Sequence, residues 1–155
     1  DRNGFVVESI TNDKCASGSG RFIEMVSEAI DIPFDSISEH VRQSETTYKI
    51  TSNCAVFAES EIISMVNDNR NKDDIIASVF HSIVTRVSAM LERINAIDDI
   101  TLIGGVSKIE AFRMLFEKET SYRNMVLPMD IQLIAAYGAA LVAQGKWKLP
   151  AGKRH

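Results

Sequence analysis

The chain has 155 residues, of which 45% are hydrophobic and 25% are charged, and its formal net charge is −4 at pH 7. This length and composition are typical of one globular domain with a substantial core. The acidic balance gives no electrostatic support to a nucleic-acid partner. No apolar run approaches the roughly 18–20 residues that span a bilayer, so no membrane partner is expected either.

The two ends of the chain carry their own expectations. No basic segment leads into an apolar one at the start, so we expect no signal peptide and a cytoplasmic location with reduced thiols. The first residue is Asp1 and not Met, which indicates a piece of a longer chain. Residues 1–145 are expected to form the folded part, and the basic residues 146–155 a flexible tail.

The first third of the chain predicts a strand and two helices. Asn3–Thr11 is rich in Val and Ile and predicts a strand. Apolar residues at helical spacing predict a helix over Asp13–Ile30, with Asn12 or Asp13 as its N-cap and Pro33 closing it. A short helix is predicted over 34–45.

Two long helices are predicted in the middle of the chain, after a second strand over Thr46–Thr51. The first helix follows Cys54. A polar loop over 67–74 separates it from the second helix, which Asp73 or Asp74 begins and which carries a broad apolar stripe.

The last third alternates strands and helices. A buried strand ends in the glycine pair Gly104–Gly105, and a helix capped by Ser107 follows. A short strand over 124–128 leads to a final helix over 130–145. The small residues of that helix predict close packing against a neighbour: Ala136, Gly138, Ala139 and Ala140. This alternation indicates an α/β layer with a parallel sheet.

The two cysteines lie in similar surroundings. Cys15, in NDKCASGSGRF, and Cys54, in SNCAVFAESE, are each expected at a helix N-terminus, where the helix dipole favours the metal-binding thiolate. Two cysteines are too few for a closed iron–sulfur site, but a two-fold dimer would supply four. The alternative is a pair of buried, inert thiols.

Other polar residues give weaker indications. The segment LIGGVSK, over 102–108, follows a strand, so its glycines could approach a flat ligand closely or simply form a tight turn. Glu59 and Glu61 follow Cys54 closely, and dipole complementarity is a sufficient account of both. His81 is expected in the core or an interface and not as a ligand. No catalytic residue is identified.

Taken together, NDKCASGSGRF, SNCAVFAESE, LIGGVSK and AAYGAAL resemble the BadF/BadG/BcrA/BcrD type of ATPase, the activators of 2-hydroxyacyl-CoA dehydratases and benzoyl-CoA reductases. The resemblance implies an actin-like fold of two ribonuclease-H-like domains. It implies a homodimer that shares one [4Fe-4S] cluster, held by Cys15 and Cys54 of each subunit. It also implies that ATP hydrolysis, with Mg²⁺, drives one electron into an acyl-CoA dehydratase or reductase.

The same resemblance assigns the adenosine side of the nucleotide site to Gly104, Gly105, Val106 and Lys108. The family's N-terminal domain, with its phosphate-binding motifs, is not found in this sequence, so the chain alone is expected to be inactive. An Asn that usually follows the double glycine is replaced by Ile109. Two other interpretations stay open at this point: the second domain of an actin-like sugar or small-molecule kinase without a cluster, and a fragment with only an interaction role.

Overall fold

The computed structural model describes residues 6–12, 20–51, 55–97, 99–122, 125–127 and 130–146. Within these residues the chain forms α-helices, two single turns of 3₁₀-helix and two short strands. The helices are α1 (Gly20–Ala29), α2 (Ile37–Gln43), α3 (Ala55–Asn67), α4 (Lys72–Arg93), α5 (Glu110–Glu119) and α6 (Ile134–Ala143). The 3₁₀ turns are η1 (Phe34–Ser36) and η2 (Gly105–Lys108), and the strands are β1 (Ile100–Thr101) and β2 (Met125–Val126).

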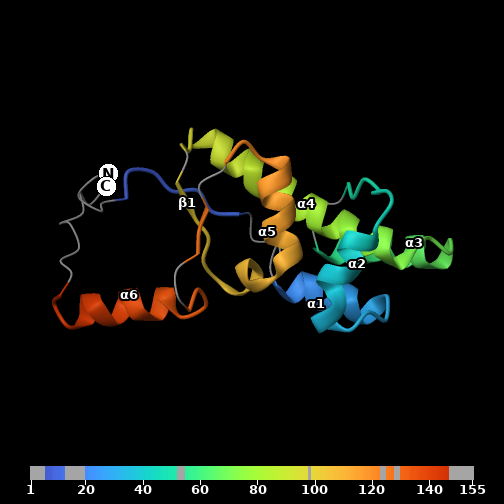
Figure 1. Cartoon of the computed structure of the whole chain (residues 1–155), viewed down its shortest axis with the longest axis horizontal. Helices are drawn as coiled ribbons and strands as arrows, with labels where there is room; N and C mark the ends of the chain where they lie inside the picture. The colour runs from blue at the N-terminus through green and yellow to red at the C-terminus, as the bar shows by residue number, and fades with distance from the viewer. Residues whose placement is uncertain are drawn as a thin grey trace.

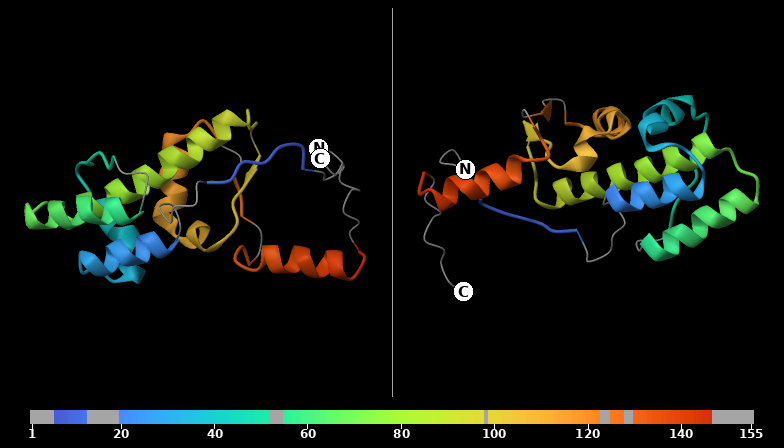
Figure 2. Two further views of the ribbon diagram at one scale, coloured as in Figure 1. Left: turned by 180° about the vertical axis from the view of Figure 1, so that it is seen from behind. Right: turned by 90° about the horizontal axis from the view of Figure 1, so that it is seen from below.

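Helix α4 is the centre of the molecule. It contacts α1, α2, α3 and α5, while α2 also contacts α5 and α1 also contacts α3. Figures 1 and 2 show the pair α2 and α5 on one side of α4 and the pair α1 and α3 on the other. The predicted apolar stripe of this helix is confirmed, because apolar residues between Ile75 and Val84 are buried.

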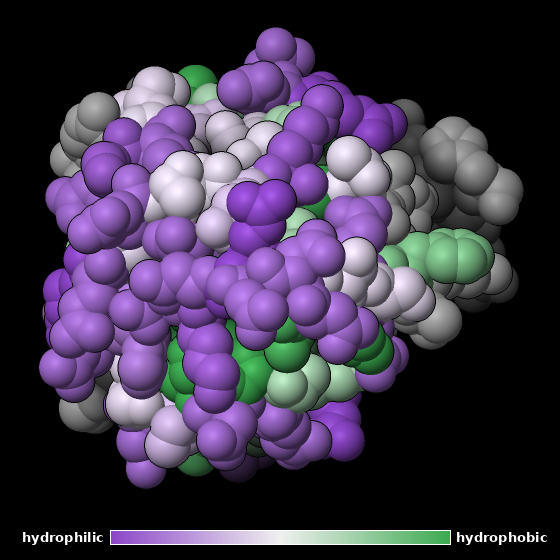
Figure 3. Space-filling view, turned by 90° about the vertical axis from the view of Figure 1, so that its right-hand side faces the viewer, coloured by the Kyte–Doolittle hydropathy of each residue, from purple (hydrophilic) through white to green (hydrophobic). Residues whose placement is uncertain are grey.

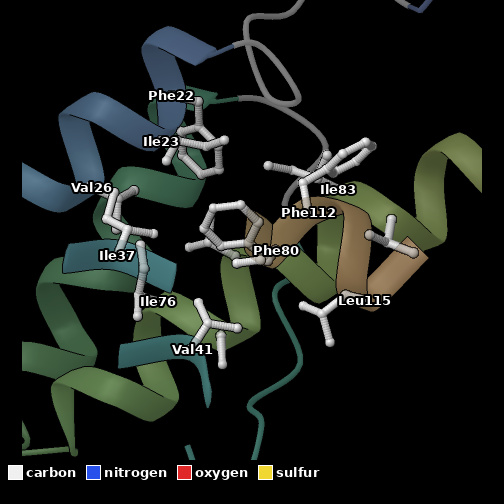
Figure 4. Close-up of a cluster of buried hydrophobic side chains, with 14 of the residues drawn as sticks. Phe22, Ile23, Val26, Ile37, Val41, Ile76, Phe80, Ile83, Phe112 and Leu115 are labelled. Carbon is white, nitrogen blue, oxygen red and sulfur yellow. The ribbon is translucent and has the colours of Figure 1, made fainter. Parts of the chain in front are cut away.

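The core forms where α1, α2, α4 and α5 meet. Phe80 of α4 is fully buried and lies among apolar side chains from α1, α2 and α5 (Figure 4). Phe116 of α5 is also fully buried, with its ring 5.9 Å from that of Phe112 and 6.3 Å from that of Tyr122, measured between centroids. Burial of this many Ile, Val and Phe side chains is the main stabilising contribution to the fold.

The start of α4 differs from the prediction by one or two residues. The helix begins at Lys72, and Asn71 is its N-cap, with its side-chain oxygen accepting a hydrogen bond from the Asp73 N–H at 2.8 Å. Asp73 and Asp74 lie in the first turn, where their charge complements the helix dipole. Asn71 is therefore the residue that ends the polar loop.

The two strands that the structure describes are parallel, as the sequence predicted. Ile100 pairs with Met125 and Thr101 with Val126. The two N-terminal strand predictions fail within the described residues. Residues 6–10 form no strand, and neither do residues 46–51. In the latter segment the N–H groups of Thr46, Tyr48 and Thr51 donate to side chains of α3 and α4.

The N-terminus of helix α5 is capped by Ser38 of α2 and not by the predicted Ser107. Ser107 lies in η2, and its hydroxyl donates to the Ile103 carbonyl, so it does not cap α5. The helix begins at Glu110. The N–H of Ala111 in its first turn donates to Oγ of Ser38 in α2, at 3.1 Å. The cap therefore also links α2 to α5.

Helix α6 stands apart from the other helices (Figure 1), and it has no buried residue. Leu133, just before it, is 58% exposed, and Tyr137 within it is 62% exposed. The close packing predicted from its small residues is thus wrong for the described part of the chain. Figure 3 shows a face of the molecule on which side chains are mostly hydrophilic, with a limited apolar area among them.

Helix α4 is long and apolar enough to cross a membrane, contrary to the expectation that no segment of the sequence is. Half of its most apolar stretch is buried inside the protein, however, and its first turn carries the buried Asp74. These are the properties of the central helix of a globular core.

Candidate functional site

The glycine turn after β1 has a backbone that favours glycine. Gly104 adopts φ +93°, a region that side chains rarely occupy. Its N–H donates to the Ile131 carbonyl at 2.8 Å, so the turn is tied to the segment before α6. Ser107 and Lys108 are held by Arg113 of α5, whose Nη1 donates to both of their carbonyl oxygens at 2.7 Å. The turn is therefore a fixed platform.

A cavity of about 670 Å³ opens beside this platform. Three of the four residues predicted for the nucleotide site line it: Gly105, Val106 and Lys108. Gly104 is not among the lining residues, and its contribution is the sharp turn of the backbone. The volume lies within the ordinary range for small-molecule sites, about 300–1,000 Å³.

The opposite walls of this cavity come from segments far from the glycine turn in sequence. They belong to α1, η1 and α2, and their lining residues are Gly20, Glu24, Phe34, Asp35, Ser36, Ser38, Glu39 and Arg42. Sequence reasoning did not find these residues, because their sequence pattern predicts only helix faces and a turn. Packing of α2 against α5 brings the two sets together.

Two polar contacts cross the rim of the cavity. Lys108 Nζ donates to Oε1 of Gln132 at 2.9 Å, and Arg42 pairs with Glu110 at 3.0 Å. Gln132 also comes close to the place where a side chain on Gly105 would lie, 3.8 Å from that position. Both contacts are at the surface, so their side chains are free to exchange their present partners for a bound ligand.

The residues predicted as metal ligands, Cys15 and Cys54, lie outside the described part of the chain. The helices that follow them are described, and they are neighbours. Helices α1 and α3 contact each other and run side by side (Figures 1 and 2). Cys54 directly precedes the first residue of α3. Elsewhere in the described residues, no three His, Cys, Asp or Glu side chains gather as a metal site.

The remaining polar residues singled out in the sequence take structural contacts. His81 is half-buried on α4, and its Nδ1 lies 2.6 Å from Oε1 of Glu119, so it is neither a core residue nor part of the cavity beside the glycine turn. Glu61 binds Thr51, through both carboxylate oxygens. Dipole complementarity is therefore an incomplete account of Glu61.

Comparison with known proteins places the chain. Residues 1–143 match the model of the BadF/BadG/BcrA/BcrD ATPase family. The chain belongs to this family. The match includes both cysteine motifs and the glycine turn, and it confirms the resemblance noted from the sequence.

Members of the family with curated names are similar along most of the chain. The 2-hydroxyisocaproyl-CoA dehydratase activator of Clostridioides difficile is 34% identical over 143 residues, which are 92% of this chain and 53% of that protein. The (R)-2-hydroxyglutaryl-CoA dehydratase activating ATPase of Acidaminococcus fermentans is 33% identical over 144 residues, 93% of this chain and 55% of that protein. The chain thus spans about half the length of these relatives.

Solved structures of family members have the same fold. The activator of the 2-hydroxyisocaproyl-CoA dehydratase from Clostridium difficile, with bound ADPNP, superimposes with a TM-score of 0.77 at 29% identity, over 98% of this chain and 59% of that one. Component A of the Acidaminococcus fermentans (R)-2-hydroxyglutaryl-CoA dehydratase gives 0.75 at 33% identity, over 87% and 52%. The predicted actin-like fold class is confirmed.

Proposed function

We propose that this chain is part of an ATP-dependent activator that passes one electron to an acyl-CoA dehydratase or reductase. The family match over residues 1–143 carries the proposal. Relatives named as dehydratase activators support it, and so does a relative from Thauera aromatica that is named as part of a benzoyl-CoA reductase. This membership favours an activator over the kinase and interaction-only alternatives. We further propose that the activator works in the cytoplasm.

The cavity beside the glycine turn is the proposed site for the adenosine part of ATP or ADP. The bend at Gly104 lets the backbone of Gly105 and Val106 face a flat ring without an intervening side chain at Gly105. Lys108 and Gln132 present a donor and an amide at the rim, where ribose hydroxyls or the base edge could take over their present hydrogen bond. A relative with bound ADPNP supports a nucleotide in this family. The phosphate-binding and catalytic residues, with Mg²⁺, are assigned to the rest of the full-length protein.

Cys15 and Cys54 are the proposed ligands of a [4Fe-4S] cluster shared by two subunits. Their chemistry fits the cluster, because thiolates are its usual ligands, and two subunits would supply the four that it needs. When bound, the cluster stores and releases one electron. The contact between α1 and α3 supports the pairing, since each cysteine precedes one of these two helices. Side by side, the two helices would transmit a change at the nucleotide cavity, which includes Gly20 of α1, to the cysteines.

Anaerobic reconstitution of the full-length protein with iron and sulfide tests the cluster. We expect about one four-iron cluster per dimer, and loss of both cluster and iron-dependent dimer in Cys15→Ser and in Cys54→Ser, because each change leaves only two thiolates per dimer. A Cys54→Ser protein that retained a full cluster and still activated its partner enzyme would contradict the ligand assignment.

Calorimetric titration of the full-length protein with ADP tests the cavity. Lys108→Ala and Gln132→Ala should each weaken binding by about three- to tenfold, the usual range for one polar contact. Lys118→Ala is the matched control, because Lys118 lies near the other end of α5 from the cavity. Equal ADP affinities for all three variants would show that the nucleotide does not bind in this cavity.

A further inference from the structure

The segment before Cys54 is anchored by side chains of α4 instead of by a neighbouring strand. The backbone N–H groups of Glu45 and Thr46 donate to Oδ1 of Asp74, at 2.9 and 3.1 Å. The N–H of Tyr48 donates to Oγ of Ser78 at 2.7 Å. The chain is therefore fixed in space on its way from α2 to the cysteine.

Glu61 supplies the last described anchor before the cysteine. Its Oε2 accepts the Thr51 N–H at 3.0 Å, and its Oε1 accepts the Thr51 hydroxyl at 2.8 Å. Glu61 belongs to the second turn of α3, which begins at Ala55. The three residues 52–54 are thus the whole connection between a residue clamped to α3 and the first residue of α3 itself.

We propose that Glu61 is a positioning residue for Cys54, because its carboxylate ties Thr51, three residues before the cysteine, to α3. The inference rests on the proposed function in so far as Cys54 is a metal ligand. Three residues can span only a limited distance, so tying Thr51 to α3 limits how far Cys54 can lie from that helix. Hydrogen bonds to an ionised carboxylate are also stronger than neutral ones.

The exposure of this clamp separates positioning from stability. Both hydrogen bonds are at the surface, where water competes for the same groups, so their loss should change global stability little. The effect of the clamp should instead be local to residues 51–54. Glu59, on the same helix with the same charge, provides the comparison, because Thr51 takes its described side-chain contacts from Glu61.

The first test uses the metal-free chain with Cys15→Ser, in which Cys54 is the one remaining cysteine. The rate of Cys54 reaction with the thiol reagent DTNB at fixed pH reports the freedom of residues 52–54, and hydrogen exchange reports the Thr51 N–H. Glu61→Gln replaces bonds to an ionised carboxylate by weaker neutral ones, and Thr51→Val removes the hydroxyl, so each should raise the reaction rate about three- to tenfold. Thr51→Ser, which keeps the hydroxyl, and Glu59→Gln should stay within twofold of the parent.

Equal rates for Glu61→Gln and Glu59→Gln would overturn the positioning role, since both changes remove one charge from the start of α3. An unchanged urea midpoint for Glu61→Gln confirms that a faster rate is local. If that variant is globally unfolded, Thr51→Val against Thr51→Ser decides the same question.

The second test separates this inference from the proposed function. With both cysteines present and iron and sulfide supplied anaerobically to the full-length protein, Glu61→Gln should bind less iron and show a shifted reduction potential, whereas Glu59→Gln should match the parent. A parent protein that binds no iron would overturn the cluster and leave the clamp to be judged by the thiol and exchange rates. A parent that binds iron, with a Glu61→Gln variant identical to it in all these measurements, would overturn the clamp alone.

Discussion

Helices α4 and α6 both contain a long apolar stretch, yet α4 is the centre of the core and α6 buries no residue. Helix α4 has polar positions between its apolar ones, so it has a defined face for α2 and α5 to cover. Helix α6, IAAYGAALVA, has no charged residue and no polar face. A helix that is apolar all round is normally covered on all sides. Apolar content therefore favours the burial of a helix. The arrangement of its apolar and polar positions decides whether neighbouring helices of this chain can cover it.

The largest expected effect is on the α4 side of this comparison. Phe80→Ala would empty the middle of the core and should lower the free energy of unfolding by about 3–5 kcal/mol, measured by urea denaturation. If that protein does not fold, Ile76→Val, at a fully buried neighbouring turn, should cost about 1 kcal/mol. A loss for Phe80→Ala below about 1 kcal/mol, the cost of a single buried methylene, would show that the core is not centred on α4.

Asp74 is the next largest contribution, since it is buried and anchors the chain before Cys54. Burial raises the pKa of this carboxyl, but the N–H groups of Thr46 and Glu45, together with the side chains of Ser44 and Tyr48, outweigh burial and hold its pKa below the ordinary value. Asp74→Ala leaves both N–H groups without their acceptor and should cost about 2 kcal/mol at neutral pH, measured by urea denaturation.

The lowered pKa also predicts the direction of a pH effect. The ionised carboxylate stabilises the fold at all pH values above its unfolded pKa of about 4. This stabilisation is lost as the pH falls below about 4 through the lower folded pKa. Unfolding of the parent and of Asp74→Asn should therefore be compared from about pH 6 to about pH 2.5, and the variant should show the shallower decline in the acid range. Parallel curves would contradict the assignment.

Ser38 has a smaller expected effect. Ser38→Ala removes the cap from the Ala111 N–H and one link between α2 and α5, and should lower the free energy of unfolding by about 1 kcal/mol. Ser107→Ala is a suitable comparison, because Ser107 does not cap the helix. If urea denaturation showed a loss of stability for Ser107→Ala and none for Ser38→Ala, Ser107 would be the cap of α5, as the sequence predicted.

The smallest effect is expected on α6. Tyr137→Ser replaces a side chain that is 62% exposed, so it should change the free energy of unfolding by no more than about 0.5 kcal/mol. A loss of several kcal/mol in the same urea assay would mean that α6 packs in solution against part of this chain.

The elements that the sequence predicted well are those in which local pattern and tertiary packing agree. The stripe of α4 and the parallel strands around the glycine turn follow from periodicity and alternation alone. The prediction of a strand over residues 46–51 was wrong, because β-type residues do not tell whether a strand or side chains will take the backbone N–H groups. Here Asp74 and Ser78, about 30 residues later, take them.

The candidate site divides in the same way. The glycine turn was visible in the sequence, since a strand followed by two glycines has few other structures available. The opposite walls of the cavity were not, because Ser38 and Arg42 reach it only through the packing of α2 against α5, which are far apart in the sequence. Glu61 and Glu59 look alike in sequence, and only the structure identifies Glu61 as the one that binds Thr51.

The exposed α6 has a consequence for how copies of this molecule behave in concentrated solution. Exposed apolar helices of two copies associate without a fixed geometry. Sulfate strengthens that association, and mild detergent weakens it. Sedimentation of the metal-free chain should therefore show mass that increases with ammonium sulfate and falls with Tyr137→Ser. The dimer proposed for the cysteines would have the opposite signature: it would require iron, ignore detergent and dissociate with a chelator.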